Sequence, residues 1–184
     1  MRLEGLIQEL ENQRPLKWDK GINSSKMDMV LSENKVGFNI DGRNDLFCIT
    51  RPCHDQIAER LEIPVKYYQR MASEDPDLLI ENVNAWLKRI GKDFFIRGLG
   101  DHVRAFLSNR YRVIDHLDVL YCALNEVQTN EAEIEDCFIS ETEMNVKVKS
   151  NRLIDFVRHR DDRITGGLLL TNSETGHKAL RIEP

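Results

Sequence analysis

The chain has 184 residues, of which 41% are hydrophobic and 31% charged, a balance typical of a folded globular protein rather than a disordered tail or a fibre. Its apolar runs are far shorter than the roughly 20 residues that cross a bilayer, and no export signal is evident, so we expect a cytoplasmic protein. The formal net charge of -5 excludes a protein that is basic all over, although a local basic face is still compatible with it.

The first part of the chain predicts a helix followed by a small antiparallel sheet. Apolar residues at 3, 6, 7 and 10 share one helical face, which stops before Pro15. From 26 to 49 the period changes to two, with apolar residues at 27, 29 and 31, then at 36, 38 and 40, and a third apolar run at 46–49. The turns between these runs are polar, so the segment predicts a meander of three strands.

A block of helices is expected next. Thr50 is a candidate N-cap with Pro52 in the first turn, and a further turn or two of helix follows Pro64. Asp75 and Pro76 then begin a longer helix that Gly91 ends. Its apolar stripe predicts that the following side chains are buried: Leu79, Val83, Trp86 and Leu87.

The second half of the chain predicts two more hairpins separated by a helix. Apolar runs at 94–96 and 103–107 flank a glycine turn, and Asp115 with Asp118 forms a capping-box-like start for a helix. Residues 134–139 and 144–148 predict the third hairpin, and 168–184 read as strand, turn and strand. Because the strands form local clusters with helices inserted between them, we expect an α+β fold in one domain, 1–184, incomplete at its C-terminus.

No pattern in the sequence indicates catalysis or a metal site. Histidines adjoin carboxylates at 54–55, 101–102, 115–118 and 159–162, but without the spacing of a metal motif. The four cysteines, at 48, 53, 122 and 137, lack the close pairs of a zinc or redox motif. The Gly-Leu-Gly of 98–100 is interpreted as a hairpin turn rather than a phosphate loop. The sequence therefore predicts no catalytic residue, no metal and no cofactor.

One group of basic and aromatic residues is suited to binding an anionic polymer. Arg104 and Phe106 alternate with apolar residues, which predicts a strand with one basic and aromatic face. Arginines contact phosphates and exposed aromatic rings stack on bases, a combination used for single-stranded nucleic acid. The alternative is that Phe106 belongs to the core and that the arginines are solvated or paired with acids. The expected contact residues are Arg97, Arg104, Phe106, Arg110, Tyr111, Arg112, Lys147 and Lys149.

Four sequence motifs point to a known family. They are Phe-Ile-Arg-Gly at 95–98, Ser-Asn-Arg-Tyr within the run 103–115, Thr-Asn-Ser-Glu-Thr-Gly at 171–176, and Leu-Glu-Ile-Pro-Val-Lys-Tyr-Tyr at 61–68 after the extended 48–50. Together they span most of the chain and resemble the phage/plasmid-like family of unknown function, domain-of-unknown-function family nine-three-two. Members of that family usually continue past the 171–176 turn with an arginine-containing strand and a Cys-x-Asn-Gly segment, which implies a truncated chain here.

The resemblance implies a protein carried by phages, prophages or plasmids in a bacterial host, and it leaves three hypotheses open. The first is a non-enzymatic accessory protein that binds nucleic acid, single-stranded DNA above all, similar to phage annealing proteins of the RecT or Erf type and able to form homo-oligomers. The second is a protein-binding inhibitor of a host defence complex, because an acidic surface suits a nucleic-acid-binding target. The third is a metal-dependent nuclease, which requires the histidines and aspartates to converge.

Overall fold

The computed structural model describes residues 1–32, 35–41, 46–130, 132–156 and 163–184. Contacts divide the chain into two compact units. Unit 1 comprises Met1–Pro15 and Arg112–Pro184, and unit 2 comprises Leu16–Tyr111. Each unit has its own sheet and its own hydrophobic core, and the two are described separately. The expected single domain over 1–184 stays a prediction.

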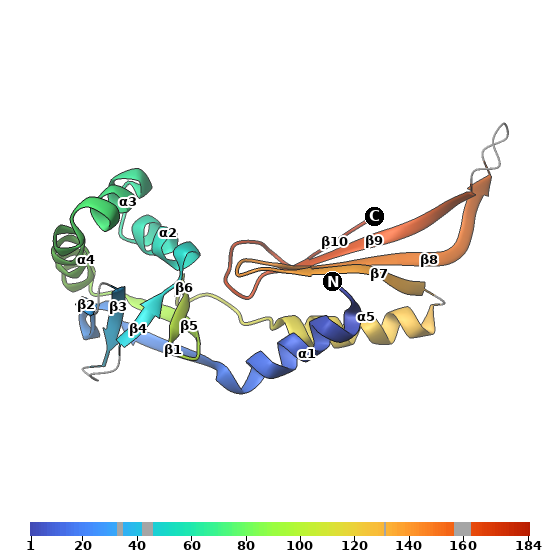
Figure 1. Cartoon of the computed structure of the whole chain (residues 1–184), viewed down its shortest axis with the longest axis horizontal. Coiled ribbons are helices and arrows are strands. Elements are labelled where there is room, and N and C mark those ends of the chain that lie inside the picture. Colours follow the sequence, from blue (N-terminus) through green and yellow to red (C-terminus); the bar gives the residue numbers. More distant parts are fainter. Residues whose placement is uncertain (33–34, 42–45, 131, 157–162) are drawn as a thin grey trace. The chain divides into compact units, whose positions relative to one another are not determined.

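Unit 2 is built on sheet A, a six-stranded sheet with the order β1-β5-β6-β4-β3-β2 (Figure 1). Its strands are β1 (Lys17–Asn23), β2 (Met27–Ser32), β3 (Lys35–Ile40), β4 (Leu46–Ile49), β5 (Asp93–Leu99) and β6 (His102–Ser108). Neighbouring strands are antiparallel except β4 and β6, which are parallel. The meander predicted over 26–49 is confirmed as β2, β3 and β4, whereas β1 was not predicted.

Three helices lie on one face of sheet A: α2 (Arg51–Arg60), α3 (Val65–Glu74) and α4 (Pro76–Ile90) (Figure 1). The boundaries of α4 are as predicted. The Asp75 carboxylate accepts a hydrogen bond from the Leu78 N–H at 3.1 Å, and Gly91 ends the helix in the left-handed conformation at φ 54°. The prediction for Trp86 is wrong, because this side chain is 38% exposed. The buried positions of α4 recur every four residues, and Trp86 lies about 100° around the helix from Leu87.

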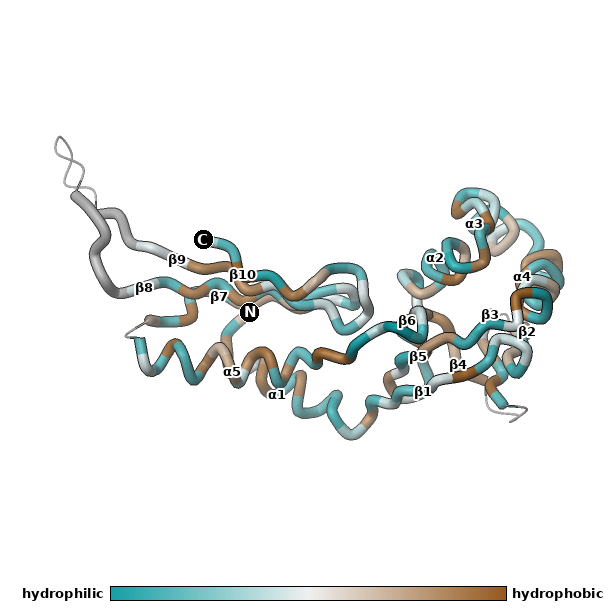
Figure 2. The backbone as a smooth tube through the Cα atoms, turned by 180° about the vertical axis from the view of Figure 1, so that it is seen from behind, coloured by the Kyte–Doolittle hydropathy of each residue, from teal (hydrophilic) through white to brown (hydrophobic). Residues whose placement is uncertain are grey.

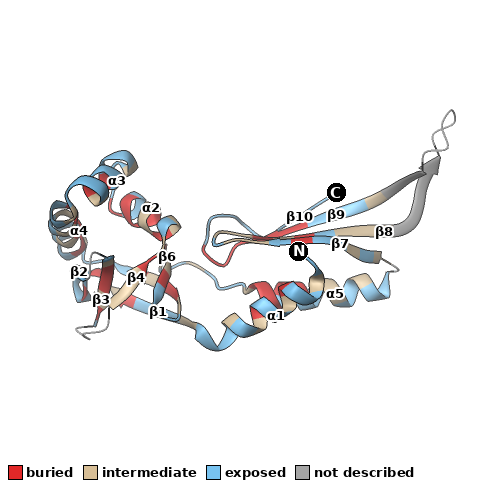
Figure 3. Cartoon of the chain, in the orientation of Figure 1, coloured by how far each residue is buried: buried red, intermediate tan, exposed pale blue. Residues whose placement is uncertain are grey.

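The core of unit 2 lies between these helices and sheet A (Figure 3). Leu79, Val83 and Leu87 are fully buried there, as predicted. The Asn84 side chain also ties α4 to the edge strand β2. It accepts a hydrogen bond from the Met29 N–H at 2.7 Å and donates one to the Met29 carbonyl at 2.9 Å. These bonds satisfy backbone groups of β2 that have no neighbouring strand.

Gly98 permits a close approach between β1 and β5. The Trp18 ring lies over this glycine, and a Cβ added at Gly98 would meet Trp18 Cε2 at 2.0 Å. The indole N–H donates to the Gly100 carbonyl at 2.8 Å, and the ring also packs on Phe47 with 4.9 Å between the centroids. The absence of a side chain at Gly98 therefore allows Trp18 to join β1 to the hairpin of β5 and β6.

Unit 1 combines two helices with sheet B, an antiparallel sheet with the order β10-β9-β8-β7 (Figure 1). The helices are α1 (Leu3–Gln13) and α5 (His116–Thr129), and the strands are β7 (Ala132–Ile139), β8 (Met144–Phe156), β9 (Arg163–Asn172) and β10 (Arg181–Glu183). Apolar residues recur along both helices between hydrophilic ones (Figure 2). Leu6, Leu10 and Leu120 from the helices form a core with Met144 and Val146 of β8.

The two sheets and their helices confirm the α+β class and the predicted local hairpins. No helix in the part of the chain that the structure describes is long and apolar enough to cross a membrane. All four cysteines are free. Cys53 and Cys137 are buried, whereas Cys122 is exposed and Cys48 is half-buried.

Candidate nucleic-acid interface

The fold buries two of the residues expected to contact nucleic acid. Arg97 is only 5% exposed, and its guanidinium pairs with Asp19 of β1 at 2.8 Å from Nε to Oδ1 and 3.2 Å from Nη2 to Oδ2. Phe106 is fully buried against Phe94 and Phe38, with 4.4 and 6.2 Å between ring centroids. A paired guanidinium and a core ring have no surface to offer a phosphate or a base, so neither belongs to the interface.

Arg104 lies at an irregularity between β5 and β6. The register passes from the pair Arg97 and Ala105 to the pair Gly98 and Val103, and so skips Arg104. The strict alternation that placed Arg104 and Phe106 on one exposed face therefore does not continue through this point. Arg104 is half-buried and has bonding partners within the fold.

Arg110, Tyr111 and Arg112 lie at the junction between the two units of the chain. Both arginines are exposed, whereas Tyr111 is half-buried with its ring stacked on Phe95 at 6.0 Å between centroids. Tyr111 also donates its backbone N–H to the Ser108 carbonyl at 3.0 Å, which fixes the turn after β6. The two arginines are therefore accessible to phosphate, whereas the tyrosine ring already has an aromatic partner.

Lys147 and Lys149 project from the outer face of sheet B, the face opposite the helices. Met144, Val146 and Val148 pack on the core, so the alternating positions of β8 point the other way. Lys147 pairs with Glu135 at 2.7 Å, and that hydrogen bond raises the pKa of the lysine and lowers the pKa of the glutamate. Lys149 is half-buried and stands opposite Glu133 of β7 in the register.

The outer face of sheet B also carries an aromatic ring that was not predicted. Phe138 of β7 is 53% exposed, and it pairs in the register with Asn145, which shares a face with Lys147. Phe138 and Lys147 are thus diagonal neighbours, a separation that long side chains can bridge. Arg181 of β10 belongs to the same face, because it pairs with Thr171, which in turn pairs with Asn145.

A β-bulge explains why Phe138 faces solvent. The register between β7 and β8 shifts between Ile134 and Asp136, so Glu135 is an extra residue. Ile134 and Cys137 both contribute to the core, although they are three residues apart. Strict alternation from Ile134 would have placed Phe138 inside, and the bulge reverses that order.

A buried polar turn holds the start of α5. The expected capping box is absent, since the Asp115 side chain makes no cap bond; instead the buried Glu174 carboxylate accepts the His116 N–H at 2.7 Å. The Asn172 amide donates to the Ile114 carbonyl at 3.1 Å. These bonds show that residues of the 171–176 motif position α5 on sheet B.

A partly buried polar contact joins α2 and α3. His54 Nδ1 lies 2.7 Å from the Tyr68 hydroxyl. Burial lowers the pKa of His54 to about 4, and nearby Asp55 only partly opposes the effect. Burial also raises the pKa of Tyr68 and of the Cys53 thiol. All three groups are therefore held neutral, which suits packing rather than proton transfer or thiolate chemistry.

Among residues 1–32, 35–41, 46–130, 132–156 and 163–184, no group of three or more His, Cys, Asp or Glu residues is placed to hold a metal. The histidine and aspartates at 159–162 lie outside the described residues.

No family model, curated protein or solved structure matches this chain. The resemblance to the phage/plasmid-like family, carried by the motifs at 61–68, 95–98, 103–115 and 171–176, therefore stays a proposal.

Proposed function

We propose that the chain is a phage- or plasmid-borne accessory protein that binds single-stranded nucleic acid on the outer face of sheet B. The observation that supports this proposal best is the exposed ring of Phe138 on the same face as Lys147, Lys149 and Arg181. A base stacks on an exposed ring whatever its sequence, and the cations contact the phosphates on either side.

The arrangement favours a single strand over a duplex. In a duplex the bases are stacked on one another, so a ring on a sheet surface reaches only the backbone, whereas an unpaired base can turn onto Phe138. The outer face also carries Glu133, Asp136 and Glu183. These acids limit the number of phosphates that the face attracts, so we expect binding of modest affinity with little sequence preference.

The test is a fluorescence-anisotropy titration of a labelled oligothymidylate of about 16 nucleotides, the upper range of one OB-fold site. Loss of a stacking ring costs about 1–3 kcal/mol, so Phe138→Ala should weaken binding by about 5- to 150-fold. Lys149→Ala should reduce the logarithmic salt slope by about 0.7, the value for one phosphate contact on a single strand. Arg110→Ala and Arg112→Ala measure whether the exposed junction arginines add contacts.

Two matched variants control for the general effect of removing an exposed side chain. Tyr67 is an exposed aromatic residue on α3 and Lys66 is its exposed neighbour, and both belong to unit 2. Tyr67→Ala and Lys66→Ala should leave affinity and salt slope unchanged. Two results would reject the outer face as the binding surface: an affinity of the folded protein for the oligonucleotide that does not depend on salt, or an equal loss of affinity in Phe138→Ala and Tyr67→Ala.

A further inference from the structure

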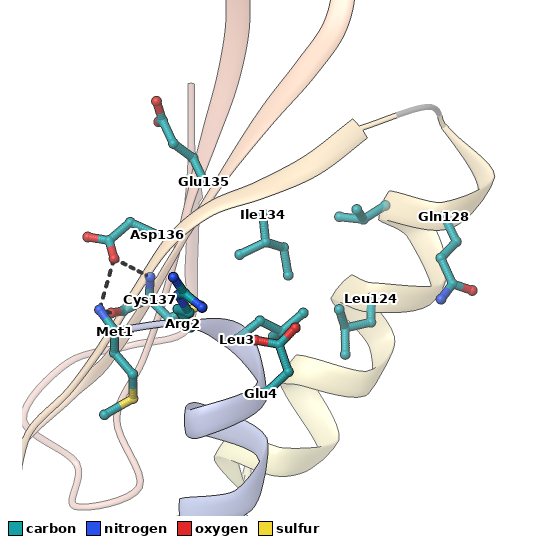
Figure 4. Close-up of a pocket in the computed structure, with 11 residues that line it drawn as sticks. Met1, Arg2, Leu3, Glu4, Leu124, Gln128, Ile134, Glu135, Asp136 and Cys137 are labelled. Carbon is teal, nitrogen blue, oxygen red and sulfur yellow. Dashed lines mark hydrogen bonds and ion pairs between the residues drawn. The ribbon is translucent and has the colours of Figure 1, made fainter.

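A cleft opens in unit 1 between the start of α1, the second half of α5 and the bulged strand β7 (Figure 4). Its volume is about 650 Å³. Clefts of about 300–1,000 Å³ are typical of binding sites for drug-sized ligands. The cleft opens on the helix side of sheet B, whereas the nucleic-acid binding proposed above uses the outer face; the two surfaces meet at the bulge of β7, where Asp136 and the ion pair of Glu135 with Lys147 border both.

The floor of the cleft is apolar. Leu3, Leu124 and Ile134 come from α1, α5 and β7, and all three point toward one another in Figure 4. They are only partly buried, although each packs on the core of unit 1. Val127 adds a fourth apolar side chain from the next turn of α5. The floor thus presents hydrophobic surface to solvent at a place where three elements meet.

The rim carries three carboxylates, those of Glu4, Glu135 and Asp136, together with Gln128 and two cations, Arg2 and the Met1 ammonium. Asp136 Oδ1 already accepts a hydrogen bond from the Met1 ammonium at 3.0 Å, and this contact lowers the pKa of the carboxyl. Glu135 is bonded to Lys147, which reaches it from β8. Two carboxylates of the rim thus already bind ammonium groups of the chain itself, those of Met1 and Lys147.

The two helices that border the cleft are acidic in composition. In the sequence α1 carries Glu4, Glu9 and Glu11, and α5 carries Asp118 and Glu126, whereas neither helix contains a lysine or an arginine. Unit 1 has 11 Lys and Arg against 17 Asp and Glu, a net charge of -6, whereas unit 2 has 15 against 14, a net charge of +1. The acidic balance of the whole chain thus belongs to the unit that contains the cleft.

We propose that this cleft docks a basic amphipathic segment of a partner protein. An apolar floor with anionic surroundings is complementary to a helix that has leucine-like anchors on one side and lysines or arginines beside them. The anchors enter the space between Leu3, Leu124 and Ile134. The cations approach Glu4 on the rim, since Asp136 and Glu135 already pair with the Met1 ammonium and with Lys147. Nucleic acid is disfavoured at this place, since the same carboxylates repel phosphate.

The probe is a synthetic helical peptide of leucines and lysines with one apolar face. Its comparison peptides replace every lysine by glutamate, or every leucine by serine. Binding is followed by the methyl NMR signals of Leu3, Leu124, Val127 and Ile134 in the full chain. We expect saturable shifts of these signals with the leucine–lysine peptide and none with the other two.

Two variants on α5 provide a matched pair. Gln128 lines the cleft, whereas the exposed Asn125 does not, and both become lysine in Gln128→Lys and Asn125→Lys. Because one exposed ion pair is worth up to about fivefold in affinity, Gln128→Lys should weaken binding by up to about fivefold, and by about tenfold when combined with Glu4→Lys. Asn125→Lys should change affinity by less than about twofold, since its charge lies outside the cleft.

Three outcomes would overturn the proposal. The first is that none of the four methyl signals shifts with the leucine–lysine peptide. The second is equal binding of the leucine-free peptide, which would mean that the floor is not used. The third is an equal loss in Gln128→Lys and Asn125→Lys, which would assign the attraction to the general charge of unit 1. Phe138→Ala separates this site from the nucleic-acid face, since it should leave peptide binding intact.

Discussion

Mild acid is expected to destabilise unit 2 through His54. Burial lowers the pKa of this ring from 6.5 to about 4 in the folded chain. Below pH 6.5 the unfolded state therefore binds a proton that the folded state does not, so the stability is complete above pH 6.5 and is lost as the pH falls toward 4. Since one pKa unit is worth about 1.36 kcal/mol, the whole effect is about 3 kcal/mol, of which about 2 kcal/mol is lost between pH 7 and pH 5.

Tryptophan fluorescence isolates this effect. Both tryptophans of the chain, Trp18 and Trp86, belong to unit 2, so their emission during a urea titration follows the unfolding of that unit. His54→Gln retains an oxygen that can accept the Tyr68 hydroxyl but has no proton to gain. Between pH 7 and pH 5 the free energy of unfolding of this variant should fall by about 2 kcal/mol less than that of the native chain.

The matched control is His102→Gln. His102 is exposed at the turn between β5 and β6, where its ring bonds to the Asp101 carboxylate at 2.6 Å. Carboxylates that titrate in this range contribute equally to the native chain and to the variants, so the difference reports the histidine alone. If His54→Gln loses as much stability between pH 7 and pH 5 as the native chain does, the ring is not held neutral by burial and the reasoning fails.

Two further predictions concern stability at neutral pH. Glu174→Ala removes the acceptor of the buried His116 N–H and should lower the free energy of unfolding of unit 1 by about 2 kcal/mol, measured by circular dichroism in urea. Glu174→Gln retains an acceptor oxygen and should lower it by less. Equal losses in the two variants would contradict the role of this bond. Gly98→Ala should displace the Trp18 ring, lower the free energy of unfolding of unit 2 by about 2 kcal/mol and shift the indole fluorescence emission. Gly21→Ala should do none of these, because the added Cβ there has open space around it. Unchanged emission in Gly98→Ala would refute the close approach of Trp18 to Gly98.

Elements with strong local signals were predictable from the sequence. The period of two over 26–49 gave the strands β2, β3 and β4, because their partners are close along the chain. The cap at Asp75 and the stop at Gly91 set the limits of α4. The strand β1 was missed because it contains a glycine and an aspartate and pairs with β5, whose residues are 70 to 82 positions away along the chain.

The candidate interface was harder to predict than the fold, and the same missed strand is one reason. Asp19, the partner of Arg97, lies on β1, so without that strand Arg97 looked like a free surface cation. Phe106 could not be distinguished from an exposed ring until the register of β5 and β6 showed the side of the sheet on which it lies. The exposure of the Phe138 ring depends on a β-bulge, and the sequence pattern does not reveal the single extra residue that forms it.

Unit 1 is formed by two separate segments of the chain, and this affects how it folds during synthesis on the ribosome. The hydroxyl of Tyr121 on α5 donates to Glu11 on α1, and 110 residues separate the two. At about 5–20 residues per second, α1 leaves the ribosome about 5–20 s before its partner helix exists. Leu6 and Leu10, fully buried in the finished fold, are exposed to water throughout that interval, while every residue of unit 2 is being translated. Unit 2 can therefore complete its own core first, and α1 remains a nascent segment that a chaperone can bind.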